Sequence, residues 1–169
     1  TLVAAQNKYQ VLRITNSRDG LIHELDRTPP TVGISVMGLI DWVRRYQLMR
    51  THTALHILCG VIWRDYGAQA TGGNMKPLAA RMDFELESMS ANFASEIETQ
   101  ANAEIQNARP VEISSLPRNE AMKVPDLIRT KINLLPQDIK EIRIVDIVGL
   151  DLQADGGTHV HNTKEVGQL

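Results

Sequence analysis

The sequence predicts an α+β fold in which an antiparallel sheet packs with helices and a small β-rich lobe precedes them. Strictly alternating stretches such as residues 80–87 are typical of half-buried antiparallel strands. Residues 42–66 and 93–105 carry apolar side chains every three or four positions, which indicates amphipathic helices. These stretches follow one another without a repeating βαβ order, so the pattern favours α+β over a doubly wound sheet.

Residues 1–45 are expected to form the β-rich lobe. Residues 9–15 alternate well enough to form a strand, residues 16–20 are typical of a turn, and residues 21–25 fit the returning strand. Residues 32–41 follow as a further extended segment with glycines at its bends.

A long helix is predicted over residues 42–66. Asp41 fits its N-cap, and Gly67 suits the left-handed position that commonly follows a helix. His52 and His56 share one face of this helix, next to an apolar stripe. We therefore expect the histidine face to border the core.

Further elements are expected towards the C-terminus. The second helix should stop near Pro110, because proline disrupts a helix interior. Residues 111–116 and 141–148 fit two strands, with a short helical or irregular stretch over residues 118–138 between them.

Composition fits a folded domain and excludes several classes of protein. The 169 residues are 43% hydrophobic and 22% charged, which is ordinary for a chain with a real core. With 18 basic and 20 acidic side chains, only a local basic patch would attract a polyanion. The single cysteine excludes an intramolecular disulfide and is compatible with a reducing cytosol. No apolar run reaches bilayer length, so we expect a cytoplasmic protein without a membrane partner.

Four of the five histidines stand in two tight groups. His52 and His56 lie one helical turn apart and can reach one ion, although such a pair alone is more often structural. Thr53 stands where a zinc protease needs a glutamate base. Near the C-terminus Asp155 and His159 flank two glycines, whose loop lets side chains converge. Imidazole and carboxylate are both zinc ligands, so these two groups together predict a metal site between the long helix and the C-terminal glycine loop.

Two neighbours of these groups have simpler interpretations. His161 lies two residues beyond His159 and could be a ligand, a substrate contact or a surface residue, of which the surface position is favoured. Cys59 lies one helical turn beyond His56 and fits best as a small buried hydrophobe.

Three stretches carry a family resemblance: "VMGLIDWVRRYQLMRTHTALH" (residues 36–56), "GAQATGGN…RMDFELE" (residues 67–87) and "DGGTHVHNTKEVG" (residues 155–167). They closely resemble the AlaX family of free-standing alanyl-tRNA editing proteins. These proteins are similar to the editing domains of alanyl-tRNA synthetase and, more distantly, of threonyl-tRNA synthetase. The resemblance runs from about Gly33 to Gly167.

The resemblance implies a zinc site in which His52 and His56 form the family's HxxxH pair. Asp155 and His159 occupy the positions of its CxxxH pair, so Asp155 replaces the usual cysteine. A carboxylate is a harder ligand than a thiolate, so zinc affinity should fall and another divalent ion becomes acceptable. A metal-bound water or a metal-bound substrate would carry the chemistry, and no protein group is assigned as catalytic.

The implied activity is trans-editing: hydrolysis of mischarged Ser-tRNA(Ala), extending to Gly-tRNA(Ala). Thr71 is the candidate partner of the serine hydroxyl, with a turn threonine bonded to its own backbone as the alternative. Gly156 and Gly157 are candidate substrate contacts. The competing hypothesis is a tRNA-binding or structural relative that has lost metal-dependent editing, which the replacement at Asp155 keeps open.

Longer members of the family carry a glycine-rich GGGQP-type motif before the first strand pair. The chain begins at about the point where that motif would end. We therefore expect residues 1–45 to be a partial N-terminal lobe whose upstream glycine-rich half is missing. Residues 46–169 are then expected to be the aminoacyl-tRNA deacylase domain, as in medium-length family members.

Overall fold

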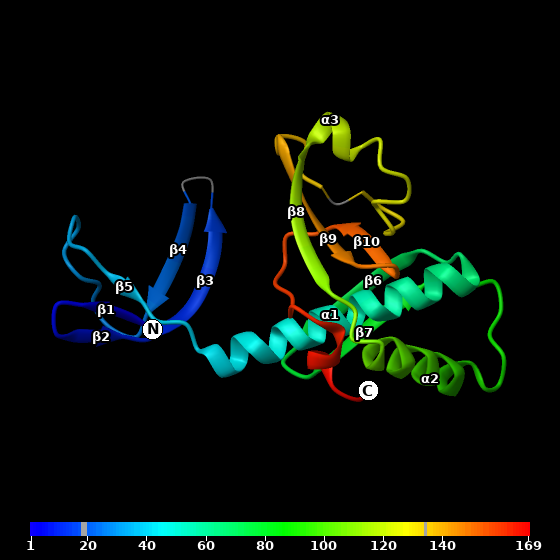
Figure 1. The fold of residues 1–169 in the computed structure, drawn as a ribbon. Helices are drawn as coiled ribbons and strands as arrows, with labels where there is room; N and C mark the ends of the chain where they lie inside the picture. Colours follow the sequence, from blue (N-terminus) through cyan, green and yellow to red (C-terminus); the bar gives the residue numbers. More distant parts are fainter. Residues whose placement is uncertain (18–19, 134) are drawn as a thin grey trace. The chain divides into compact units, whose positions relative to one another are not determined.

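The computed structural model describes residues 1–17, 20–133 and 135–169 and confirms the α+β class (Figure 1). The chain divides into two compact units, Thr1–Arg45 and Tyr46–Leu169. All strand pairs within the sheets are antiparallel. Among the described residues, no helix combines the length and apolarity that crossing a bilayer requires.

The first unit consists of short antiparallel strands. One sheet has the order β2-β1-β5, from β1 (Leu2–Ala4), β2 (Asn7–Tyr9) and β5 (Met37–Gly38). A hairpin pairs β3 (Val11–Ser17) with β4 (Gly20–Leu25).

The β3–β4 hairpin corresponds to the strand pair predicted from alternation. Of the predicted turn over residues 16–20, residues 18–19 lie outside the described part of the chain. The extended segment expected over residues 32–41 contributes only the two residues of β5. Polar and apolar side chains alternate only weakly in this stretch, because glycines interrupt the pattern. The sequence therefore does not specify how the stretch pairs with another strand.

Helix α1 (Trp42–Tyr66) has the predicted bounds. An Asp41 carboxylate oxygen accepts the Arg44 backbone N–H at 3.0 Å, which is the predicted N-cap. Gly67 adopts φ 63°, the left-handed conformation expected after the helix. At Gly60 a Cβ would lie 2.7 Å from the Leu150 side chain, so glycine lets the helix approach the sheet closely.

The second unit is built on a three-stranded sheet of order β10-β9-β8. Its strands are β8 (Val111–Pro117), β9 (Glu141–Ile147) and β10 (Asp151–Ala154), and Figure 1 shows them beside α1. Alternate residues of the central strand β9 face opposite sides of the sheet, as the period of a strand requires.

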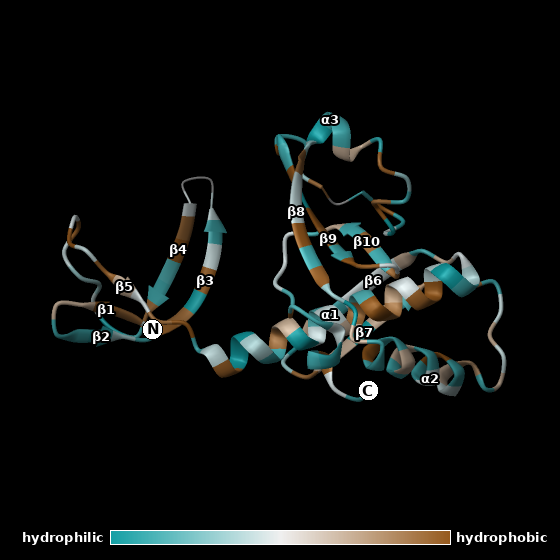
Figure 2. Cartoon of the chain, in the orientation of Figure 1, coloured by the Kyte–Doolittle hydropathy of each residue, from teal (hydrophilic) through white to brown (hydrophobic). Residues whose placement is uncertain are grey.

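One face of this sheet forms the main core. Val145 and Ile147 of β9 pack there against Ile57 of α1 and Ile105 of α2 (Phe93–Gln106). Figure 2 shows both helices with hydrophobic residues on part of their circumference and hydrophilic residues on the rest. This amphipathic pattern explains why the helices cover one face of the sheet.

The opposite face of the sheet forms a smaller core. Ile142 and Ile144 of β9 pack there with Ala121 of α3 (Arg118–Ala121) and with Leu127. Leu127 belongs to the irregular segment between α3 and β9, of which residues 122–133 and 135–140 are described. The short helix α3 and this segment correspond to the short helical or irregular stretch predicted over residues 118–138.

A second hairpin lies near α1, and only half of it was predicted. Strand β7 (Ala79–Phe84) overlaps the alternating stretch predicted over residues 80–87, but it begins one residue earlier and ends before residue 87. Its partner β6 (Ala70–Lys76) was not expected, because two consecutive glycines and mostly polar side chains are typical of a loop. Pairing with β7 supplies the backbone hydrogen bonds that this polar segment needs.

The C-terminal segment is fastened to α1 and α2. It ends in a short 3₁₀ helix, Thr163–Val166, which carries a capping box between Asn162 and Glu165. Arg50 of α1 donates hydrogen bonds to the Val166 carbonyl at 3.0 and 2.7 Å. The loop that precedes this helix is thereby held against α1.

Candidate metal centre

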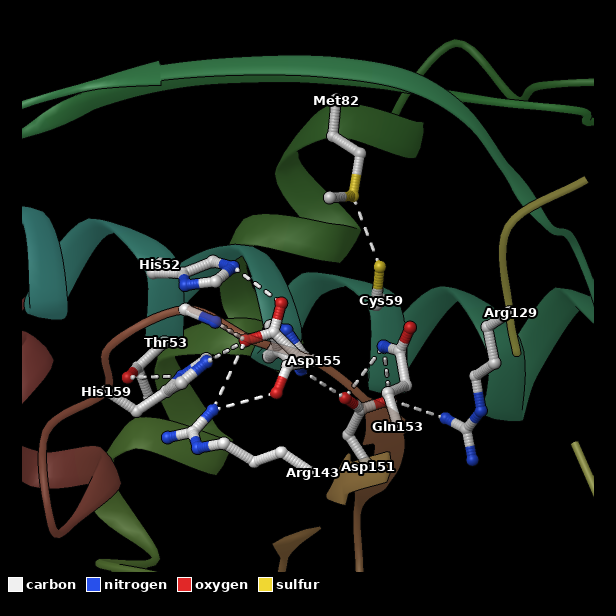
Figure 3. Close-up of polar contacts among 12 residues, drawn as sticks. His52, Thr53, Cys59, Met82, Arg129, Arg143, Asp151, Gln153, Asp155 and His159 are labelled. Carbon is white, nitrogen blue, oxygen red and sulfur yellow. Dashed lines mark hydrogen bonds and ion pairs between the residues drawn. The ribbon is translucent and has the colours of Figure 1, made fainter. Parts of the chain in front are cut away.

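Four side chains converge between α1 and the loop that follows β10: His52, His56, Asp155 and His159. Each offers one ligand atom, and these atoms all lie within 4.8 Å of one another. Figure 3 shows the labelled side chains of His52, Asp155 and His159 pointing towards one another. The four residues that the sequence singled out are thus brought together.

Asp155 lies at the centre of the contacts within this cluster. Its carboxylate oxygens lie 3.5 Å from His52 Nε2 and 3.2 Å from His159 Nε2. The Gly157 backbone N–H donates to Asp155 Oδ2 at 2.6 Å. Arg143 of β9 donates to the Asp155 carbonyl oxygen at 2.8 Å, which fixes the start of the loop.

Burial favours the neutral form of two imidazoles of the cluster, those of His52 and His159. It lowers the pKa of His52 to about 4, and the nearby His159 and His56 rings act in the same direction. Burial likewise lowers the pKa of His159. For Asp155, burial alone would raise the pKa, but the hydrogen bond with His159 and the His52 and His56 rings hold it below its usual range. A neutral imidazole and an ionised carboxylate are the forms that bind metals.

The cluster fits a divalent ion such as Zn²⁺. The buried Nδ1 atom of His52 has no hydrogen-bond partner among the described residues. The other ring nitrogen, Nε2, lies 3.5 Å from an Asp155 carboxylate oxygen and is the atom that His52 offers to an ion in the cluster. Three imidazoles and one carboxylate also form a donor set typical of Zn²⁺.

Two further side chains, those of Asp151 and Thr53, contact the Nδ1 atoms of His56 and His159 and orient these rings. His56 Nδ1 lies 2.8 Å from a carboxylate oxygen of Asp151, and both side chains are buried. The Thr53 hydroxyl lies 3.2 Å from His159 Nδ1 and accepts the Val160 backbone N–H at 3.2 Å. Hydrogen bonds of this kind fix the ring orientation of metal-binding histidines.

The two glycines of the loop have different surroundings. A Cβ on Gly157 would lie 2.2 Å from Cε1 of His52, whereas a Cβ on Gly156 would meet nothing within 4 Å. Gly157 is therefore required for the close approach of the loop to the His52 ring.

A cavity of about 480 Å³ opens beside the cluster. His52, His56 and Asp155 line it, together with residues from β9 and from the irregular segment 122–140. Its wall is mixed, with apolar side chains such as Leu135 next to the polar cluster. A small polar group attached to a larger molecule fits such a space.

The structure places the remaining candidates as follows. Thr71 is an exposed residue at the bulge of β6, directly after Ala70, which lines the cavity. His161 is exposed and lies outside the cluster. Cys59 is buried, and burial raises the pKa of its thiol to about 12, as suits a small core residue. A contact between Thr71 and a substrate stays a prediction.

Sequence reasoning missed the polar residues behind the cluster. Asp151 and Gln153 alternate with the apolar residues Leu152 and Ala154 along β10, and both are buried. This period-two pattern, which continues to Asp155, was the available signal.

The C-terminal part of the chain is similar to a recognised class of domain. A family model described as "Threonyl and Alanyl tRNA synthetase second additional domain" matches residues 142–169. These residues include β9 from its second residue onwards, β10 and the loop with Asp155 and His159. The match therefore covers half of the histidine and carboxylate cluster.

Proteins similar over most of the chain define the family. The alanyl-tRNA editing protein AlaX-M of Saccharolobus solfataricus is 38% identical over 164 residues, which are 96% of this chain and 68% of that protein. AlaX-M of Methanosarcina barkeri is 37% identical over 94% of this chain and 67% of its own length. The alanine–tRNA ligase of Ignicoccus hospitalis is 35% identical over 99% of this chain but only 19% of the ligase. The chain belongs to the AlaX family of alanyl-tRNA editing proteins.

Proposed function

We propose that the chain is a metal-dependent aminoacyl-tRNA deacylase that removes serine, and also glycine, from mischarged tRNA(Ala). The observation that supports this most directly is the cluster of three buried or half-buried histidines and Asp155 beside a cavity, in a member of an alanyl-tRNA editing family. The partner, tRNA(Ala), follows from the names of the relatives. Because charged tRNA serves translation, the proposed location is the cytoplasm.

The proposed metal ligands are His52, His56, Asp155 and His159, with Zn²⁺ as the proposed ion. The ion would supply a Lewis acid towards the ester or the attacking water. Asp155 contributes negative charge, which an imidazole ligand does not. The Gly157 N–H accounts for part of the hydrogen bonding of that carboxylate.

The chemistry required is modest, which suits the groups present. An aminoacyl ester is an activated bond, so a well-placed water is sufficient for hydrolysis. Apolar side chains such as Leu55 and Leu135 form part of the cavity wall, and electrostatic interactions are stronger beside an apolar wall than in bulk water. Thr71, Gly156 and Gly157 are the proposed contacts of the aminoacyl group.

We also propose that residues 46–169 form the deacylase domain and that residues 1–45 form a separate N-terminal lobe. The four proposed ligands and the lining of the cavity all belong to the second unit.

A second function is favoured by one residue, Asp155. It stands where the resemblance to the family implies a cysteine, and the softer thiolate is the better zinc ligand. On this alternative the chain binds tRNA(Ala) without hydrolysing its ester. Binding of Ser-tRNA(Ala) with no deacylation at any metal concentration would support it.

The test is deacylation of Ser-tRNA(Ala), Gly-tRNA(Ala) and Ala-tRNA(Ala) by the wild type and by His56→Ala. We expect release of serine and glycine by the wild type and no release by the variant, because loss of a ligand disables a catalytic metal site. His23→Ala removes an exposed histidine of the first unit and is the matched control. Full activity in His56→Ala would contradict the proposed site.

A further inference from the structure

We propose that Asp151 is a positioning residue that keeps the His56 proton on Nδ1 and so leaves Nε2 free to bind the metal. Arg129, on the cavity wall, holds Asp151 in place for this role. The inference rests on the proposed metal site, but its first test needs no metal.

The geometry of the His56–Asp151 pair is that of a buried, short hydrogen bond. His56 is 6% exposed and Asp151 is 2% exposed, and the bond length is 2.8 Å. A carboxylate can only accept a hydrogen bond, so the proton between the two groups belongs to Nδ1 of the imidazole. The lone pair of the neutral ring is then on Nε2.

Both oxygens of Asp151 have further donors, which fix the carboxylate as an acceptor. Arg129 Nη1 donates to Oδ1 at 2.7 Å. Gln153 Nε2 lies 3.1 Å from Oδ1 and 2.9 Å from Oδ2 (Figure 3). The side chain of Asp151 is fully buried, so these donors compensate for the lost hydration of its charge.

Arg129 is itself held at two points. Its guanidinium lies over the Trp63 ring of α1, 5.4 Å from the ring centroid. Its carbonyl oxygen accepts the Ala70 N–H at 3.0 Å, and the Ala70 carbonyl accepts the Lys131 N–H at 2.9 Å. The irregular segment that covers the cavity is thereby joined to β6. A continuous set of contacts runs from the cavity wall through Arg129 and Asp151 to His56.

Glu104 provides a matched control within the same chain. It is also buried, and it pairs with Arg64 at 2.6 Å and with Arg109 at 2.7 Å. Among the described residues, the side-chain contacts of Glu104 are with Arg64, Asn107 and Arg109, so replacement of Glu104 tests the effect of losing a buried ion pair away from the histidine cluster.

The first experiment measures the tautomer of His56 by nitrogen NMR of the imidazoles in the full wild-type chain after treatment with a chelator. We expect a neutral ring protonated on Nδ1, with the Nδ1 proton shielded from solvent exchange. A ring protonated on Nε2 would overturn the inference. This measurement does not depend on a variant that folds.

The second experiment measures the Zn²⁺ dissociation constant of Asp151→Asn and Glu104→Gln by competition with a chromophoric chelator. We expect Asp151→Asn to weaken binding about 10–100-fold, as is usual when the partner of a ligating histidine is changed. Glu104→Gln should leave the constant near the wild-type value, with the folded state of both checked by circular dichroism. Unchanged zinc affinity in a folded Asp151→Asn variant would contradict the role of Asp151.

The two outcomes separate this inference from the proposed function. A wild type that binds Zn²⁺ and deacylates Ser-tRNA(Ala) but carries the His56 proton on Nε2 refutes the inference alone. A wild type with the expected tautomer that binds no Zn²⁺ refutes the proposed metal site and the role assigned to Asp151 in serving it.

Discussion

His52 connects the candidate site with the stability of the metal-free protein. Its pKa is lowered from 6.5 to about 4, mainly by burial. Between these two pH values the unfolded state binds a proton that the folded state does not, so stability falls as the pH is lowered through this window. When the titration is complete, this pKa shift lowers the free energy of unfolding by an amount on the order of 3 kcal/mol. Urea unfolding of chelator-treated protein between pH 7 and pH 4 measures the loss.

The variant His52→Gln identifies the source of this pH dependence. It removes the titrating ring, so the slope of unfolding free energy against pH should decrease, with a residual slope from His159. An unchanged slope would show that His52 does not titrate with the lowered pKa.

Thr71 bears on the choice between serine and alanine. If its hydroxyl forms a hydrogen bond with the serine hydroxyl, an alanyl substrate leaves the Thr71 hydroxyl unpaired. An unpaired polar group costs about 1–3 kcal/mol, which corresponds to a roughly tenfold or larger change in rate. Ser-tRNA(Ala) should then be cleaved at least about tenfold faster than Ala-tRNA(Ala). Thr71→Val should narrow this ratio by slowing the serine reaction. An unchanged ratio in Thr71→Val would contradict a contact between Thr71 and the substrate. Equal rates on Ser-tRNA(Ala) and Ala-tRNA(Ala) in the wild type would contradict the editing function.

Among the elements, the loop after β10 offers a matched pair of substitutions. Gly157→Ala should weaken Zn²⁺ binding, because its Cβ would lie 2.2 Å from Cε1 of His52 and displace the ring or the loop. Gly156→Ala should leave binding close to wild type, because its Cβ meets nothing within 4 Å. Equal zinc dissociation constants for the two variants would contradict the close packing of this loop.

Elements with a strong local pattern could be predicted from the sequence. The bounds of α1 follow from Asp41, from Gly67 and from apolar periodicity between them. The strands β6 and β10 were not predicted, because β6 carries two glycines and the period-two pattern of β10 places polar residues on its buried side. Each is a strand because it pairs with a neighbouring strand: β6 pairs with β7, and β10 pairs with β9. Such pairing can override a weak local sequence pattern.

The candidate site, too, could be predicted only in part from the sequence. Two histidines on a helix and a glycine loop with Asp155 and His159 stand out in the sequence, and the structure gathers them. Arg129 could not be predicted, because its link to Asp151 joins residues 22 positions apart across an irregular segment. Long-range side-chain contacts of this kind have no local sequence signal.

For the whole molecule, the division into two units predicts what a fragment can do. The three hydrophobic clusters found among the described residues all consist of residues from the second unit. A fragment of residues 41–169, which keeps the N-cap of α1, should therefore fold and bind Zn²⁺ about as tightly as the full chain. A fragment that is unfolded by circular dichroism would show that residues 1–40 contribute to the stability of the second unit.

The central claim is that one metal ion at the histidine and Asp155 cluster supports hydrolysis of Ser-tRNA(Ala). The most direct measurement is the deacylation rate after removal of metal with a chelator, followed by titration with Zn²⁺. The account predicts that the rate falls to background and returns fully at one ion per chain, with no return in His56→Ala. A rate that survives complete removal of metal, or that stays at background with the ion bound, would contradict it.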